Sequence, residues 1–262
     1  MTSISAAIRV ALLTGEPREK VKTTRALVRA WRRRQLAWDF STPMPERPAW
    51  SAELELLPAN RMPQRGRGGS QRKAVALWHS LAHIEFVAID LALDMAGRFG
   101  AAMGREFVDD FLAIAADEAM HFALIDRKLR THGAHYGMLP AHDGLWEAAH
   151  ETRGDVAARL AIVPMVLEAR GLDVTPAMRD RVAANGDSSG ARVLERILDD
   201  EIRHVAVGTK HFIALCLSHG KVPQEHWKML VKRHFRGALK APFNDSARLA
   251  AGLSRDFYAG VA

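Results

Sequence analysis

Two short motifs hold residues whose types and spacing suit metal binding: Asp-Glu-Ala-Met-His at 117–121 and Asp-Glu-Ile-Arg-His at 200–204. On a helix, positions i and i+3 share one face, so the glutamate and the histidine of each motif can bind one cation. A carboxylate beside an imidazole is a natural half-site for a divalent transition metal. A further glutamate lies 33 residues before each motif glutamate. Together they form one set of six candidate metal ligands: Glu85, Glu118, His121, Glu168, Glu201 and His204.

A purely structural origin for these motifs is the alternative. A third Glu-x-x-His, Glu147 to His150, shows that the short pattern also arises by chance, since Trp146 replaces the aspartate and Ile114 stands where the upstream glutamate would be. We interpret this third pair as a solvated surface pair. Four carboxylates on apolar helix faces would be costly to bury without a cation to neutralise them. The six-residue set therefore favours a metal site over a structural role.

Helices must position these residues, and the apolar spacing predicts four long ones. The first runs from Ser70 to about Gly97 and the second from about 105 to 131, with Gly97, Gly100 and Gly104 as the turn between them. On the first helix, His79 and His83 are spaced to form a separate metal pair, although we expect hydrogen bonds within the bundle instead. Such a turn would place Glu85 and Glu118 at the same height on antiparallel helices.

The second predicted hairpin is less regular. Its first helix begins near Asp155, is kinked by Pro164 and ends at Gly171. Thr175 and Pro176 would open another short helix, and the fourth long helix runs from 188 or 189 to about 219. The glutamates at 168 and 201 would then face each other as the first two do.

The flanking segments complete an all-α prediction. Residues 1–69 are expected to form two helices, at 3–14 and 17–36, and a Pro- and Gly-rich wrap that packs through Trp31, Trp50 and the leucines near 56. Residues 70–220 are the predicted four-helix bundle. Residues 221–262 are expected to add two covering helices, at 223–238 and 244–258. The predicted domains are therefore 1–69, 70–220 and 221–262.

Composition restricts the setting of the protein. A chain of 262 residues with 48% hydrophobic residues can bury a large core. We find no apolar run as long as a membrane span, and no small-residue cleavage site follows the N-terminal segment. The single cysteine, Cys216, excludes an internal disulfide and a four-cysteine iron site. A reducing cytoplasm is the expected location.

Positive charge is concentrated near the N-terminus. Residues 1–73 hold 15 Lys or Arg against 6 Asp or Glu, while the rest of the chain is slightly acidic. Such a segment can contact nucleic acid or another polyanion. A solvated basic face is the favoured interpretation, so nucleic acid is a candidate partner that the sequence does not favour.

With these residues in place, the chain resembles the ferritin-like superfamily of di-iron carboxylate proteins over roughly residues 70–220. The paired Asp-Glu-x-x-His motifs are typical of its branch with bacterial monooxygenases, acyl desaturases, rubrerythrins and bacterioferritins. The segment Leu-Glu-Ala-Arg-Gly-Leu-Asp-Val-Thr-Pro at 167–176 is also similar to a bacterial family of ferritin-like proteins whose function is not established. The resemblance implies that the six candidate residues hold two iron ions per chain, with manganese or zinc as substitutes. It also implies that Asp117 and Asp200 each bond to a ligand histidine.

Departures from the resembling families narrow the activity. Radical-generating ribonucleotide reductase subunits carry a tyrosine four residues after the first ligand histidine, where this chain has Ile125. A rubrerythrin would carry four cysteines for a second iron site, and this chain has one. Iron-storage subunits are compact single bundles, and the 70 N-terminal residues with the C-terminal helices would have to be accommodated in a shell.

The leading function hypothesis is an O₂-activating di-iron oxidoreductase, a monooxygenase or oxidase, with no catalytic residue beyond the metal ligands. Its expected partners are an external electron donor, either a reductase or a small reductant, and a small-molecule substrate that the sequence does not identify. A homodimer is compatible with the sequence, and no membrane is expected. The alternatives are a ferroxidase, peroxide-scavenging or iron-handling protein, a tRNA-modifying hydroxylase, and a structural bundle without activity.

Overall fold

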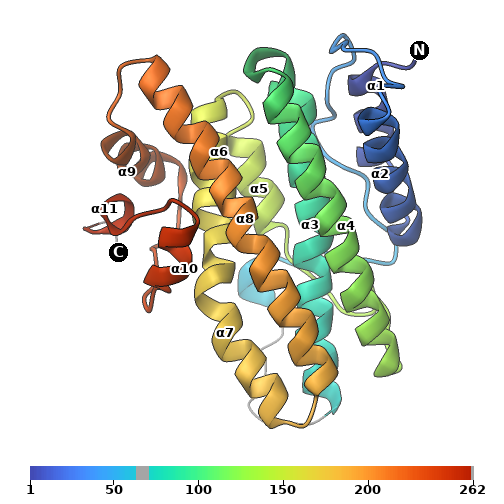
Figure 1. Ribbon diagram of the computed structural model, residues 1–262. Helices are drawn as coiled ribbons and strands as arrows, with labels where there is room; N and C mark the ends of the chain where they lie inside the picture. The colour runs from blue at the N-terminus through green and yellow to red at the C-terminus, as the bar shows by residue number, and fades with distance from the viewer. Residues whose placement is uncertain (63–70, 261–262) are drawn as a thin grey trace. The chain divides into compact units, whose positions relative to one another are not determined.

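The structure is a computed structural model that describes residues 1–62 and 71–260, and this part of the chain is helical. Within it, extended pairing is limited to two isolated bridges, Ser3 with Ala37 and Leu56 with Ala141, so the predicted all-α class is confirmed. The helices (Figure 1) are α1 (Ile4–Leu12), α2 (Pro17–Arg32), the short 3-10 turn η1 (Ala59–Arg61), α3 (Gln71–Met103), α4 (Arg105–Thr131), α5 (Gly144–Glu151), α6 (Val156–Ile162), the π-helical segment η2 (Val163–Glu168), α7 (Ala169–Ala184), α8 (Ser188–Ser218), α9 (Pro223–His234), α10 (Asp245–Ala250) and α11 (Arg255–Tyr258).

The chain divides into two compact units, Met1–Trp146 and Glu147–Ala262. The boundary falls inside α5. The division predicted from sequence, with limits after residues 69 and 220, stays a prediction. Each unit contains one of the two Asp-Glu-x-x-His motifs, so each can be described as the support of its own half-site.

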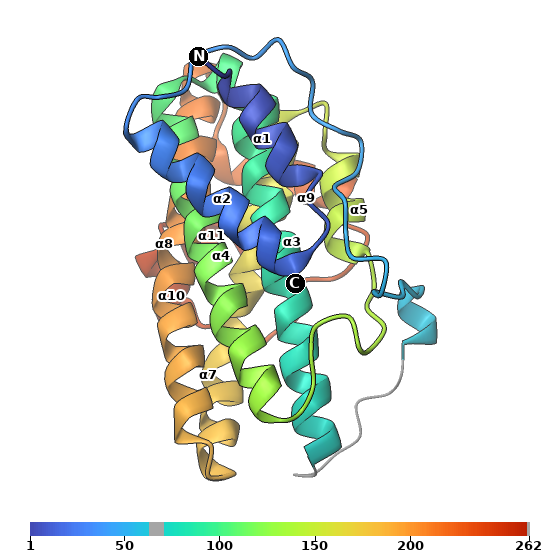
Figure 2. The ribbon, with the colours of Figure 1, turned by 90° about the vertical axis from the view of Figure 1, so that its right-hand side faces the viewer.

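In the first unit, α3 and α4 form a long antiparallel hairpin, and α1 and α2 pack beside it. Helix α2 contacts α4, while α1 contacts α2 and α3 (Figure 2). Ser3 caps the N-terminus of α1, where its side chain accepts from Ala6 N, and α2 begins at Pro17. Proline is favoured at this first helical position because its missing N–H would have no helical partner.

The turn between α3 and α4 lies at Gly104, whose φ of 90° suits glycine. The prediction that Gly97 and Gly100 belong to this turn is wrong, because α3 continues through both to Met103. These glycines serve packing instead. A Cβ on Gly97 would collide with the side chain of Met44, and one on Gly100 would lie 2.5 Å from Val108 and 2.8 Å from the Phe40 ring. They allow the N-terminal segment and α4 to approach α3 closely.

The N-terminal segment packs on the hairpin largely as predicted. Trp31 is buried and donates from Nε1 to Asp109 Oδ1 at 2.6 Å. Trp50 donates from Nε1 to Asp90 Oδ2 at 2.9 Å. Leu54 is buried, whereas Leu56 is 37% exposed, so packing through the leucines near position 56 is only partly correct. The rest of the predicted wrap, from 63 to 69, and the predicted N-cap Ser70 lie outside the described residues.

In the second unit, α6, η2 and α7 follow one another without a break, and α8 returns antiparallel to them. The prediction that the helix ends at Gly171 and restarts at Pro176 is therefore wrong. Pro176 has no N–H to donate to Leu172 O, four residues earlier. That carbonyl instead accepts from Asn244 Nδ2 at 3.1 Å, which satisfies it within the helix.

The C-terminal part is more divided than predicted. Helix α9 ends at His234 rather than 238, and the helix predicted over 244–258 is two short ones, α10 and α11, separated by a turn at Gly252. Helix α9 packs on α6 and α8, and α10 packs on α7 and α8. Both therefore cover the long helices of the second unit, α6 to α8, as expected.

One described helix, α3, is long and apolar enough to cross a membrane by length and composition, contrary to the sequence prediction. In the structure 61% of its most apolar window is buried, and core helices of soluble proteins pass the same test. Buried acidic side chains, Glu85, Asp90 and Asp94, lie along it. The helix is thus weak evidence for a membrane, and the cytoplasmic location stays a prediction.

Candidate metal centre

Three of the predicted ligands meet in the first unit. Glu85 on α3 and Glu118 and His121 on α4 each offer one ligand atom, and these atoms lie within 4.8 Å of one another. His121 Nδ1 is 3.2 Å from Glu85 Oε2 and 3.3 Å from Glu118 Oε2. All three side chains are buried. This cluster could hold a metal ion.

The electrostatics of the cluster favour positive charge at its centre. Burial alone would lower the pKa of His121, but the hydrogen bonds that Glu118 and Glu85 accept from it, together with their charges, outweigh burial and raise the pKa to about 11. Two buried carboxylates this close need a counter-charge, which a proton on His121 or a metal ion supplies. A metal ion would displace that proton, because a ligating imidazole is neutral.

The second unit contains a matching pair on α8. Glu201 and His204 are both buried, and Glu201 Oε1 lies 3.4 Å from His204 Nδ1. The spacing of three residues produces the same arrangement as in Glu118 and His121, with Nδ1 turned toward the carboxylate of its own motif. The two motifs therefore fold alike locally.

Glu168 is the last residue of the π-helical segment η2 and is half-buried. Its height relative to α8 follows from one close contact: a Cβ on Gly208 would collide with the Pro164 ring. The helix that contains Pro164 and Glu168 runs antiparallel to α8. Moving four residues forward from Pro164 and four residues back from Gly208 therefore puts Glu168 level with His204. Segments of π-helix are rare and are frequent at functional sites. The sequence predicts only a kink at Pro164.

The two predicted supporting aspartates differ in what they contact. Asp200 accepts from Arg196 Nε at 2.7 Å on Oδ2 and from Arg203 Nη2 at 2.6 Å on Oδ1, so two arginines of α8 hold it. Asp117 is half-buried on α4. The orienting role of Asp117 and Asp200 toward His121 and His204 stays a prediction.

A buried ion pair near the first half-site was missed in the sequence. Lys20 on α2 has no exposed side-chain surface, and its Nζ lies 2.5 Å from Asp90 Oδ1 on α3. Asp90 is five residues after Glu85 on the same helix. The sequence did contain a sign of this burial. Lys20 lies on the same face of α2 as Thr24 and Trp31, which is the buried face, and a solvated lysine would lie on the opposite one.

His79 and His83 do hydrogen-bond within the first unit, as expected. His79 Nε2 accepts from the backbone N–H groups of Gly137 at 3.0 Å and Leu139 at 3.3 Å. His83 lies 2.9 Å from Tyr136 Oη through Nδ1, and its Nε2 is 3.0 Å from the carbonyl oxygen of His142. Both histidines thus fasten the loop between α4 and α5 onto α3, which occupies them structurally.

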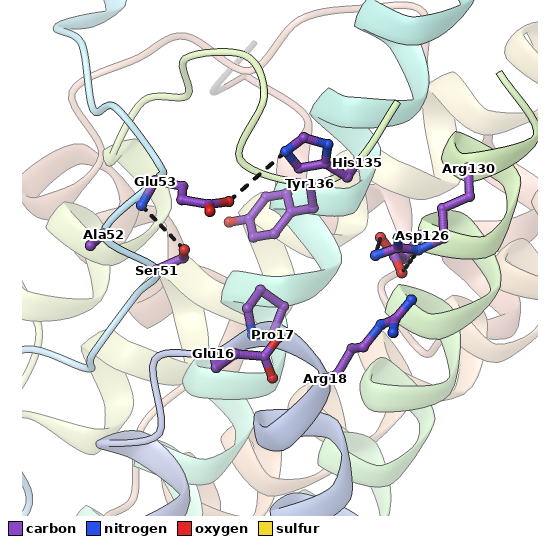
Figure 3. Close-up of a pocket in the computed structure, with 10 residues that line it drawn as sticks. All are labelled: Glu16, Pro17, Arg18, Ser51, Ala52, Glu53, Asp126, Arg130, His135 and Tyr136. Carbon is purple, nitrogen blue, oxygen red and sulfur yellow. Dashed lines mark hydrogen bonds and ion pairs between the residues drawn. The ribbon is translucent and has the colours of Figure 1, made fainter. Parts of the chain in front are cut away.

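A polar groove of about 550 Å³ also opens on the first unit (Figure 3). Helix α2, the segment around Glu53, helix α4 and the loop carrying Tyr136 form its walls. Charges of both signs line it, including the pair of Asp126 with Arg130 at 2.9 Å. None of the eight predicted site residues lines the groove. It is therefore a feature separate from the candidate metal centre.

Comparison with known proteins places the chain among relatives that carry no assigned activity. A protein of Haemophilus influenzae described as "Uncharacterized protein" is 39% identical over 210 residues, which span 78% of this chain and 73% of the relative. No solved structure matches the chain. A family model described as "Protein of unknown function (DUF455)" matches residues 13–259, and the chain belongs to that family.

Proposed function

We propose that this protein holds two transition-metal ions, iron in function, and is an O₂-activating oxidoreductase. The observation that carries the proposal is the buried cluster of Glu85, Glu118 and His121. In the proposal, the matching half-site of the second unit, Glu201 and His204 with Glu168, joins this cluster. The complete set is then four carboxylates and two imidazoles on facing helices, the ligand set of two-metal carboxylate bundles.

The donor atoms favour transition metals. Imidazole nitrogen suits iron, manganese and zinc, whereas calcium and magnesium prefer sites made of oxygen alone. Four carboxylates carry four negative charges and would balance two divalent ions. Neither the carboxylates nor the ions would then be buried without a counter-charge. Bound ferrous ions would supply the electrons that reduce O₂.

The residues of this chain would hold and shield the metals. His121 and His204 would bind through Nδ1, the nitrogen that each already turns toward its own motif glutamate. Phe86, Phe122 and Val205 directly follow the ligands Glu85, His121 and His204 in the sequence and are buried, and such apolar packing beside the ligands would exclude water from the reacting centre. Electrons must come from an external donor, since the chain has a single cysteine and no second iron site of the rubrerythrin kind.

The decisive experiment counts metal in protein expressed with iron and purified without oxygen. We expect about two ions per chain, the number that such a ligand set holds. Glu118→Ala combined with Glu201→Ala should remove most of the metal. Glu147→Ala is the matched control, because Glu147 belongs to the third Glu-x-x-His and is exposed. Unchanged metal content in the double variant, or an equal loss in the control, would contradict the site.

Enzymatic use of O₂ and iron storage are separated by two further measurements on the same samples. The oxidoreductase predicts a small oligomer, a monomer or dimer, that keeps about two irons per chain after repeated additions of ferrous iron and O₂. It also predicts renewed O₂ consumption each time a reductant is supplied. A large shell that accumulates many irons per chain would assign the protein to iron handling instead.

A further inference from the structure

The exposed side of α2 carries an unbroken row of positive side chains. Its members recur at intervals of four and three residues, which places them on one helix face. The row, called the basic stripe below, consists of Arg18, Lys22, Arg25, Arg29 and Arg32, and Arg33 and Arg34 extend it past the helix end. From Arg18 to Arg32 it covers about 21 Å at the rise of an α-helix.

The fold directs the basic stripe outward. The opposite face of α2 is buried through Val21, Thr24, Val28 and Trp31. Helix α2 packs with this face toward α1 and α4, and Figure 2 shows it as an outer helix of the first unit. Four of the five members on the helix are exposed, and Arg25 is half-buried. The stripe is thus a continuous cationic surface.

Few acidic side chains of the protein pair with the positive charges of the basic stripe. Among the described residues, only Lys22 of the stripe and its extension forms an ion pair, with Glu19 at 2.6 Å. Arginines elsewhere in the chain are commonly paired, and examples are Arg98 with Asp94, Arg130 with Asp126, Arg196 with Asp200 and Arg248 with Asp173. Six neighbouring guanidinium groups without acids repel one another, which favours binding of a polyanion along the helix.

An exposed aromatic group lies close to the end of the stripe. Trp38 is 41% exposed, and its ring centroid is 6.1 Å from that of Trp31, the one aromatic residue of α2. The Arg105 guanidinium stacks over both rings, 5.1 Å from Trp38 and 4.8 Å from Trp31. Proteins that bind single-stranded nucleic acid combine two such elements. Aromatic rings and guanidinium planes stack on the bases, and a row of positive charge binds the phosphates.

We propose that the basic stripe and Trp38 bind a single strand of nucleic acid. The arginines would bind successive phosphates, for which the planar guanidinium is suited because it donates two parallel hydrogen bonds. Trp38 would stack on a base. The exposed indole favours nucleic acid over an acidic protein or an anionic membrane, since only nucleic acid offers both phosphates and aromatic faces. The expectation of a merely solvated basic face is replaced by this proposal.

The test measures binding of a fluorescein-labelled 20-nucleotide oligo(U) to the full-length protein by anisotropy at increasing NaCl. With four phosphate contacts, the slope of log affinity against log salt should be about −2.8, or roughly a 50-fold loss between 50 and 200 mM. Charge reversal of Arg25, Arg29 and Arg32 to Glu should lower affinity more than tenfold. Trp38→Ala should lower it by a factor of about 5 or more, the size of one lost stacking contact.

A matched control reverses Lys232, Arg233 and Lys240, exposed residues of the second unit that form no ion pair in the described structure. It changes the net charge equally and should weaken binding less than threefold. Arg25, Arg29 and Arg32 to Gln is the second stripe variant, and circular dichroism checks that both remain helical. The proposal would be overturned if the protein did not bind oligo(U) at 50 mM salt, or if the control variant lost as much affinity as the stripe variant. It would also be overturned if the protein bound phosphatidylglycerol vesicles or polyglutamate more tightly than oligo(U) and Trp38→Ala left that binding unchanged. Metal content is unchanged in every variant if the two proposals are independent.

Discussion

Replacing Lys20 by Met tests the buried ion pair that joins α2 to α3. Lys20 Nζ contacts Asp90 Oδ1 at 2.5 Å and also donates to the carbonyl oxygens of Ala49 at 3.1 Å and Leu12 at 3.4 Å. Removing one member of a buried pair leaves an uncompensated charge, and such changes cost about 3–5 kcal/mol of unfolding free energy. We therefore expect Lys20→Met to be destabilised by that amount at pH 8, measured by urea denaturation.

The pH dependence of this loss sharpens the test. Burial raises the pKa of Asp90 to about 6, against the opposing effect of Lys20. Without Lys20 that pKa should rise further, while the unfolded value remains near 3.8. A carboxyl group with a raised folded pKa contributes stability below the unfolded pKa and loses it as pH rises through the folded pKa. Lys20→Met should thus be closest to wild type near pH 5 and fall progressively behind it toward pH 8.

Two comparisons separate the pair from simple loss of a lysine. Lys22→Met, on the exposed face of α2, removes a solvated pair with Glu19 and should cost less than about 1 kcal/mol. Adding Asp90→Asn to Lys20→Met should recover much of the loss, since no charge then remains buried and Trp50 keeps an acceptor. A cost in Lys20→Met no greater than in Lys22→Met, or a deficit that shrinks toward pH 8, would refute the reasoning.

Three other changes have equally definite expectations. Alanine at either Asp117 or Asp200 should weaken iron binding about 10- to 100-fold in a chelator competition, and unchanged affinity in both would remove their orienting role. Burial, with smaller repulsion from neighbouring histidines, lowers the pKa of His79 to about 4, so its contribution to stability is present above 6.5 and is lost as pH falls through 4. His79→Gln, which keeps an acceptor and cannot titrate, should abolish up to about 3 kcal/mol of that acid-induced loss in denaturation measurements, and equal loss in both proteins would contradict this. Gly208→Val should cost at least 1–3 kcal/mol in thermal or urea unfolding because its side chain meets the Pro164 ring, and a neutral effect would show that the contact is not tight.

The parts of the fold that follow from local pattern were predictable. Apolar periodicity located α4, α8 and the start of α3 within a few residues, although α3 ends six residues beyond the predicted Gly97, and the equal spacing of 33 residues anticipated that Glu85 would meet Glu118. Local spacing also placed each motif histidine beside its glutamate, since a helix alone determines that relation. These predictions needed no knowledge of distant contacts.

Features that depend on distant contacts were not predictable in this way. Gly97 and Gly100 look like turn residues until Met44 and Phe40 are known to pack against them. From the local sequence, Pro176 looks like a helix start. It is tolerated inside α7 because the carbonyl of Leu172, which it leaves without a helical donor, accepts from Asn244, 72 residues beyond Leu172. In each case a tertiary partner supplied what the local sequence lacked.

The π-helical segment before Glu168 has a consequence for how such a site can arise. A π-turn accommodates an extra residue, so everything after it is rotated by about 100° relative to the helix before it. Deleting one residue from 163–167 would restore α-helical phase and turn Glu168, together with α7, by about 100° relative to α6, so that the carboxylate meets a different neighbour. Insertion of a single codon is therefore enough to move a carboxylate onto a new face of an existing helical rod.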